Sequence, residues 1–125
     1  MSGNSGPGYA KHPEHRIITS PANARVQVVV GGEVIADTSD AIALHEATYP
    51  VVYYVPRKDV KMERLIRTSH TTHCPHKGDA TYYSLANGRT ARNAVWSYEQ
   101  PLVQVQAIKD HLAFYPDKVD AIDCS

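Results

Sequence analysis

The chain has 125 residues, a formal net charge of zero and a sequence pI of about 7.1. This length suits a single domain that buries a hydrophobic core without a metal or a disulfide framework. Basic residues alternate with acidic ones, as in 57–67, which argues against binding to nucleic acid or to an anionic membrane. No apolar run approaches the roughly 20 residues of a membrane span.

Residues 1–15 are rich in Gly, Ser, Pro and His, and we expect a flexible N-terminal segment ahead of one domain over 16–125. The segment has no charged start and no apolar centre, so it does not resemble a signal peptide. His15 becomes a candidate ligand-binding residue if the segment folds back onto the domain. The two cysteines, Cys74 and Cys124, are too far apart and too few to form a disulfide framework, so a cytoplasmic location is expected.

Alternating apolar residues and turn residues predict short β-strands over 25–30, 33–38, 41–47, 51–55 and 62–68. Gly31-Gly32 predicts a tight hairpin between the first two, because such a turn needs positive φ. The Ala and Leu content of the third segment also permits a short helix. Pro56 cannot continue a central strand and favours one helical turn over 56–60.

The second half continues with predicted strands over 80–85, 94–98, 112–115 and 119–122. Asn87-Gly88 predicts a second hairpin turn, and the spacing of apolar residues in 102–110 permits a short helix. Eight or nine short strands with at most two short helices indicate an all-β domain of antiparallel hairpins. Parallel crossovers would need ten or more helical residues between strands.

The segment from His70 to Gly78, predicted as a loop between two strands, concentrates chemically capable side chains. Its histidines and Cys74 are residue types that bind zinc, but the spacing is not one of the usual patterns and no second ligand cluster exists. The sequence therefore predicts neither a metal site nor a cofactor.

Cys74 is the first candidate for a nucleophile, because nearby cationic groups favour the thiolate; the alternative is a small buried residue under the loop. Glu46 lies in an otherwise apolar segment, where a carboxylate is costly unless it is paired. Lys77 or Arg57 is its expected partner. Glu46 is accordingly a candidate general acid or base, or one half of a structural ion pair.

An ordered series of short segments resembles the DUF427 family over about residues 6–120. The matching segments are His12-Pro13, His15-Arg16, Gly32–Thr38, Leu44–Glu46, Tyr53–Arg57, Asp59-Val60, Thr72, Cys74-Pro75, Lys77-Gly78, Trp96–Tyr98, Pro101 and Phe114–Pro116. The sequence departs from the family pattern at His73 and His76, where an aromatic residue is more common.

The resemblance implies a β-dominated, Mss4-like domain with sheets folded around a groove. It implies little about function, because fold does not fix function. Some domain catalogues label the family as nucleotidyltransferases, which usually need a Gly-Ser pair and spaced aspartates to hold Mg²⁺ at the phosphates. This sequence has no such pair with carboxylates at Asp-x-Asp spacing.

Together these observations predict a cytoplasmic domain that binds a small anionic or heteroaromatic molecule in one polar cleft. The candidate catalytic residues are Cys74 and Glu46. The candidate ligand-binding residues are Lys77, Tyr54, Arg57, Trp96, Tyr98 and His15. The alternatives are a nucleotidyltransferase-type enzyme and a non-catalytic interaction domain. No nucleic acid or membrane partner is expected, and the chain is expected to be a monomer or a homodimer.

Overall fold

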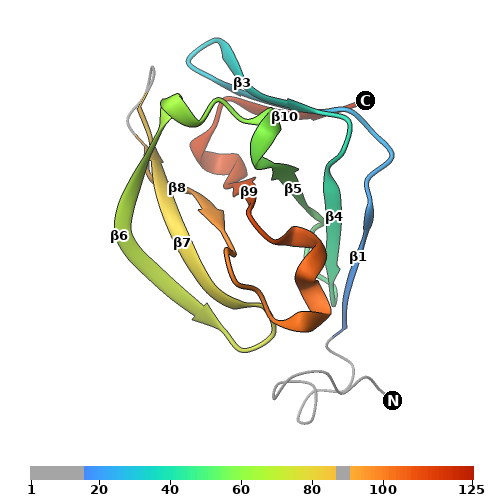
Figure 1. Ribbon diagram of the computed structural model, residues 1–125. Coiled ribbons are helices and arrows are strands. Elements are labelled where there is room, and N and C mark those ends of the chain that lie inside the picture. Colours follow the sequence, from blue (N-terminus) through green and yellow to red (C-terminus); the bar gives the residue numbers. More distant parts are fainter. Residues whose placement is uncertain (1–15, 87–90) are drawn as a thin grey trace.

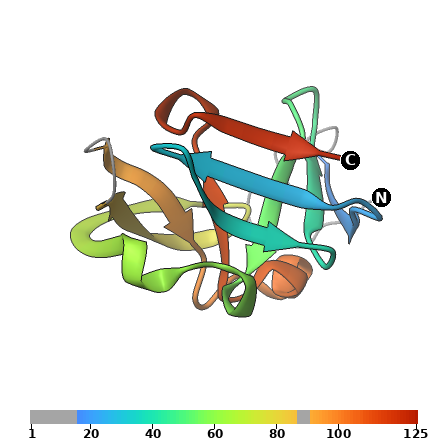
Figure 2. The ribbon, with the colours of Figure 1, turned by 90° about the horizontal axis from the view of Figure 1, so that it is seen from above.

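Two antiparallel sheets make up the computed structural model, which describes residues 16–86 and 91–125. Seven strands form the larger sheet, in the order β1-β4-β5-β9-β8-β7-β6 (Figure 1). They are β1 (Ile17–Pro21), β4 (Ile42–Glu46), β5 (Val52–Pro56), β9 (His111–Phe114), β8 (Ala91–Ser97), β7 (Gly78–Leu85) and β6 (Leu65–Cys74). Figure 2 shows the smaller sheet as three neighbouring ribbons: β10 (Ala121–Cys124), β2 (Val26–Val30) and β3 (Glu33–Thr38).

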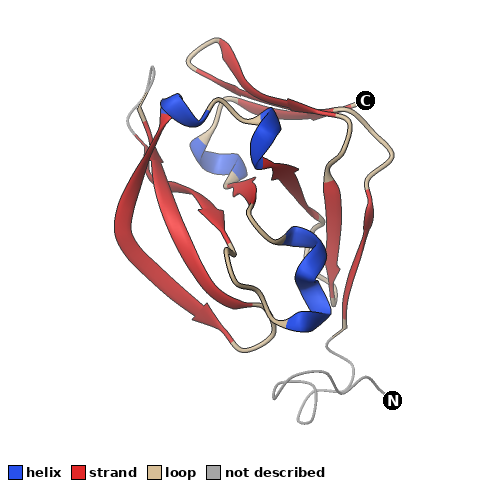
Figure 3. Cartoon of the chain, viewed as in Figure 1, coloured by secondary structure: helices blue, strands red, loops and turns tan. Residues whose placement is uncertain are grey.

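Short 3₁₀ helices connect some of the strands (Figure 3). They are η1 (Arg57–Asp59), η2 (Met62–Arg64), η3 (Val103–Ile108) and η4 (Pro116–Lys118). Within the described ranges, no helix has the length and apolar character needed to cross a membrane.

Strand alternation gives the larger sheet two apolar faces, because successive side chains point to opposite sides. One face packs against the smaller sheet, whose Val26, Val28 and Val30 are at most 1% exposed. The opposite face, called here the η3 face, is covered by Val105 and Ile108 of η3. Its buried strand residues are Leu44, Tyr54, Ala80, Tyr82 and Ala113, joined by Tyr98 directly after β8.

The predicted all-β class is confirmed by the two antiparallel sheets. The hairpin predicted at Gly31-Gly32 joins β2 to β3, with φ values of 59° and 79° at the two glycines. Positive φ at both positions is what a two-residue hairpin turn requires. The helical turn expected after Pro56 is η1.

Two predicted elements other than the His70–Gly78 loop differ from the structure, and one strand was not predicted. Residues 62–64 form η2 rather than the start of a strand, held by the contact of the Arg64 Nε with the Glu33 Oε1 at 2.9 Å. The predicted helix over 102–110 is the shorter η3, with a kink at Val105 (φ −126°). Strand β1 was not predicted, and it gains its order by pairing with β4. The predictions for 1–15 and for the Asn87-Gly88 turn lie outside the described residues.

The prediction of a loop over His70–Gly78 is wrong for most of that segment. Residues up to Cys74 continue β6, which pairs with β7 through Cys74 opposite Gly78, so that only 75–77 form the turn. The polar sequence is compatible with a strand because β6 is the edge of the sheet, and edge strands carry polar side chains that discourage further pairing.

Gly78 begins β7 with φ +116°, and a Cβ there would lie 3.3 Å from the backbone oxygen of Gln100. We predict that Gly78→Ala lowers the free energy of unfolding by about 2–3 kcal/mol, since both the backbone angle and the contact are unfavourable. Gly32→Ala is the matched control, because Gly32 has positive φ but no neighbour within 4 Å of the added Cβ. Urea denaturation of both variants measures the difference, and an equal or larger loss for Gly32→Ala would contradict the account.

Candidate functional site

The turn between β6 and β7 is held from two sides. Within the turn, the Lys77 N–H donates to the Cys74 carbonyl at 3.2 Å. From the segment that follows β8, the Leu102 N–H donates to the Lys77 carbonyl at 2.9 Å, and the Gln104 side chain donates to the His76 carbonyl at 3.5 Å. The backbone of the turn is therefore fixed before any side-chain contact is considered.

Lys77 and Glu46 form an ion pair beside this turn. The Lys77 Nζ lies 2.6 Å from the Glu46 Oε1, and the two side chains are only 11% and 16% exposed. Glu46 ends β4, so the pair joins two parts of the chain that are far apart in the sequence. Of the two cations expected to pair with Glu46, the structure places Lys77 beside it. Charge pairing at this depth is costly to break, because either partner alone would remain buried.

Aromatic side chains pack on the η3 face. The Trp96 indole N–H donates to the Tyr54 hydroxyl at 3.2 Å, and the Tyr54 and Tyr98 rings lie 6.5 Å apart. Burial raises the pKa of both tyrosines, and negative charge on Glu46 or on the Cys74 thiol raises it further. The Trp96 contact opposes this rise at Tyr54. These phenols consequently stay protonated and act as neutral hydrogen-bonding groups at physiological pH.

Cys74 ends β6 with an intermediate exposure and packs against the same apolar cluster as Tyr54 and Tyr98. The structure thus brings together six residues selected from the sequence: Glu46, Tyr54, Cys74, Lys77, Trp96 and Tyr98. We call these six residues the Cys74 cluster. Its chemistry comprises one thiol, one paired acid and cation, and a wall of flat rings.

Arg57 lies away from the Cys74 cluster, contrary to the prediction of a common site. Its guanidinium contacts the Tyr83 hydroxyl at 3.4 Å and Glu99 at 3.7 Å, and it lies over the Tyr83 ring. Tyr83 belongs to the core between the two sheets. Tyr82 and Tyr83 are consecutive residues of β7, so their side chains point to opposite faces of the sheet. Tyr82 lies on the η3 face with the Cys74 cluster, whereas Tyr83, and Arg57 with it, lies on the other face. The prediction for His15 falls outside the described residues.

The histidines of the 70–78 segment point in different directions. The His70 ring contacts the Tyr82 ring at a centroid distance of 4.6 Å, whereas the His73 Nδ1 lies 2.6 Å from Asp79. His76 is buried within the turn. In the part of the chain that the structure describes, no three His, Cys, Asp or Glu side chains are placed to share a metal ion.

A polar groove of about 450 Å³ adjoins the Cys74 cluster. Its lining residues are His70, Thr72, Tyr82, Arg92, Asn93, Tyr115, Asp117 and Lys118. The Trp96 and Tyr115 rings lie 4.4 Å apart, so the aromatic wall of the cluster continues into the groove. The Tyr82 hydroxyl adds contacts with Thr72 at 3.0 Å and with Tyr115 at 3.5 Å. The groove offers flat rings, hydroxyl groups and two cations to a ligand.

Sequence reasoning missed Tyr115 and the two groove cations, Arg92 and Lys118. A signal for Tyr115 existed: it directly follows Phe114, so alternation sends the two rings to opposite faces. The cations had no such signal, since they come from β8 and η4 and meet only in the folded chain. The Lys118 Nζ donates to the Arg92 carbonyl at 2.9 Å and lies over the Tyr115 ring.

Burial, with a contact to Tyr82, raises the pKa of Tyr115 to about 12. The unfolded chain loses this proton near pH 10, so the contribution to stability is present below pH 10 and is lost as pH rises toward 12. We predict that the free energy of unfolding falls with pH in this range and that Tyr115→Phe makes the slope shallower. Tyr54→Phe should do the same because the pKa of Tyr54 is also raised. Denaturation at a series of alkaline pH values measures the slope of the free energy of unfolding against pH. A slope in the variant equal to that of wild type would contradict the raised pKa of the substituted tyrosine.

The match to a known family covers nearly all of this architecture. Residues 18–124 match the sequence profile described as "Domain of unknown function (DUF427)", a range that includes all of the second to tenth strands and most of β1. No curated protein matches the chain. The resemblance inferred from the sequence is confirmed, and the chain belongs to the DUF427 family.

Proposed function

We propose that this protein binds a small molecule that carries a flat ring and an anionic group, in the polar groove beside the Cys74 cluster. The observation that carries the proposal is the arrangement of the groove, in which the Lys118 ammonium lies over the Tyr115 ring and Arg92 lines the same groove. A concave site with a few convergent polar groups and aromatic walls is typical of small-molecule binding.

The charges of the groove favour an anion. Of the described residues that line it, two carry cationic side chains, Arg92 and Lys118, and one carries an acid, Asp117. The Lys118 ammonium uses one of its three donors on the Arg92 carbonyl, which leaves two for a ligand. Hydrogen bonds between a cation and an oxyanion are about twice as strong as neutral ones. A carboxylate or phosphate group would therefore lie between these two side chains.

The rings of the groove favour a flat ligand. Tyr115 is half-buried, with one side occupied by Trp96, and His70 stands against Tyr82. Aromatic pairs are worth about 0.5–1.5 kcal/mol beyond their area burial. A ligand ring would extend the existing aromatic wall.

An enzyme acting through Cys74 or Glu46 is the second candidate. Thr72 lines the groove, and Cys74 follows it by two residues on β6, so their side chains are on the same face about 7 Å apart. A ligand that extends along β6 would reach the thiol. The nucleotidyltransferase activity named for the family, the Mss4-like architecture and a cytoplasmic location stay predictions. A monomeric or homodimeric state is also still a prediction, as is the absence of nucleic acid or membrane partners.

Paired ligands test the proposed function by thermal shift, because a ligand that binds only the folded state raises its melting temperature. Adenosine monophosphate and benzoate should raise the melting temperature, whereas the uncharged adenosine and benzamide should do so far less. Arg92→Met and Lys118→Met should each weaken binding about tenfold. Lys109→Met, an exposed cation outside the groove, is the control and should bind as wild type. Equal shifts for charged and uncharged members, in wild type and variants alike, would contradict the proposal.

The Glu46–Lys77 pair gives a prediction that separates stability from binding. Lys77→Met should lower the free energy of unfolding by about 2–3 kcal/mol, because it leaves a largely buried carboxylate without its cation. Adding Glu46→Gln should recover part of that loss. Chemical denaturation of the single and double variants measures both effects. A loss below about 0.5 kcal/mol for Lys77→Met would show that the pair contributes no more than an exposed one.

Cys74→Ala distinguishes binding from catalysis by Cys74. For a binding protein, the variant should retain the ligand affinity of wild type within about threefold, because the thiol does not line the groove. For an enzyme with a Cys74 nucleophile, a substrate identified by the thermal-shift series would still bind but would no longer be turned over. Isothermal titration measures affinity and product analysis measures turnover, with Cys124→Ala as the matched cysteine control.

A further inference from the structure

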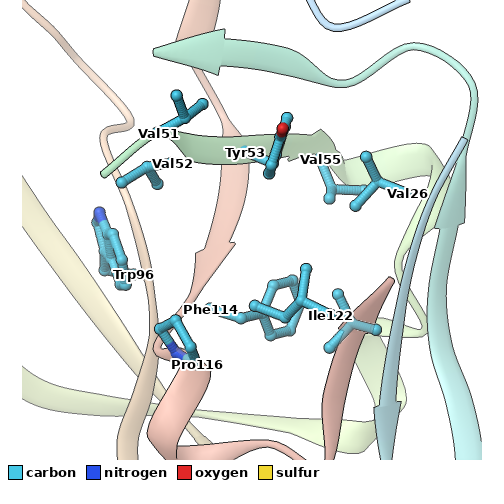
Figure 4. Close-up of a pocket in the computed structure, with 10 residues that line it drawn as sticks. Val26, Val51, Val52, Tyr53, Val55, Trp96, Phe114, Pro116 and Ile122 are labelled. Carbon is cyan, nitrogen blue, oxygen red and sulfur yellow. The ribbon is translucent and has the colours of Figure 1, made fainter. Parts of the chain in front are cut away.

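A second pocket, of about 310 Å³, lies between the two sheets and is lined by none of the residues that line the polar groove (Figure 4). It forms where two central strands separate. Strand β5 pairs with β9 only at Val55 opposite Leu112 and at Pro56 opposite His111. The preceding residues of β5, from Val52 to Tyr54, pair with β4 but not with β9. The gap between the strands at Tyr53 and Phe114 opens into this pocket.

The walls of the pocket are apolar and come from both sheets. Figure 4 shows Val52 and Val55 of β5 facing Phe114 and Ile122, with the Trp96 ring closing one end. Val28 of the smaller sheet contributes to the lining and is 1% exposed. Among the residues that the structure describes, no charged side chain lines the pocket. The Trp96 N–H is engaged with the Tyr54 hydroxyl on the η3 face, so the ring offers the pocket only its apolar surface.

Among the described residues that line the pocket, Tyr53 contributes a hydroxyl group. Its ring is half-buried, and its hydroxyl interacts with the Cys124 thiol at the end of β10. This places a hydrogen-bonding group at the mouth of the pocket, between β5 and β10.

We propose that this pocket is a second binding site, separate from the polar groove, for a compact uncharged apolar molecule such as an aromatic or alicyclic compound. Its volume is at the lower end of the range of ligand pockets, which extends from about 300 to 1,000 Å³. Apolar cavities exclude water and bind small apolar molecules. Any single uncharged polar group of the ligand lies at the mouth, beside Tyr53. A carboxylate is excluded from the interior because its burial would have no cation to offset it.

Methyl NMR of the full chain tests the site with toluene and benzyl alcohol as probes and benzoate as the charged comparison. The two uncharged probes should give saturable shifts at the valine and isoleucine methyls of the pocket, including Val28, Val52 and Val55. Benzoate should not shift these methyls, although it is expected to perturb the polar groove. No valine or isoleucine is among the described residues that line the groove, so the methyl map reports on this pocket alone, and failure of the groove is measured by the thermal-shift series.

Ile122→Phe should fill the half-buried end of the pocket and weaken toluene binding about tenfold or more. Val34→Phe is the matched control, since Val34 is a 37% exposed valine on the same small sheet outside the pocket. Should Ile122→Phe fail to fold, the wild-type methyl map decides alone. Three results would overturn the proposal: no saturable shift, shifts confined to the η3 face, or unchanged toluene affinity in folded Ile122→Phe.

Discussion

The ion pair between Glu46 and Lys77 requires the larger sheet to curl. Strands β4 and β7 are four steps apart in that sheet, and at about 4.8 Å per step a flat sheet would separate them by about 19 Å. The Lys77 Nζ nevertheless lies 2.6 Å from the Glu46 carboxylate. The sheet therefore brings its two halves around the η3 face, and the pair fixes that curvature where the β6–β7 turn meets the end of β4.

The curled sheet gives its two faces different chemistry. On the η3 face, Tyr54, Trp96 and Tyr115 follow one another as an aromatic wall that continues into the polar groove. On the opposite face, the same strands present Val55 and Phe114 to the smaller sheet and to the apolar pocket. Trp96 lines the pocket and packs against Tyr115 of the groove, so its ring lies between a site suited to an uncharged molecule and a site suited to an anion.

Local chemistry made part of this predictable from the sequence. Glu46 in an apolar segment needed a cation, and alternation placed Trp96 and Tyr98 on one face. The choice of Lys77 over Arg57 was not predictable, because it depends on strand order. The segment that forms the end of β6 was predicted as a loop because its residues are polar. Polar residues are common in an edge strand, which has a neighbouring strand on one side only. The groove gathers residues from β6, β7, β8 and η4, and the pocket forms where β5 separates from β9. The chain order does not reveal either arrangement.

A crystal structure of the protein with adenosine monophosphate is the most direct test of the proposed function. The account predicts the phosphate between the Arg92 and Lys118 side chains and the base against the aromatic wall formed with Tyr115. Nucleotide bound on the opposite face of the sheet, or no bound nucleotide at saturating concentration, would contradict it.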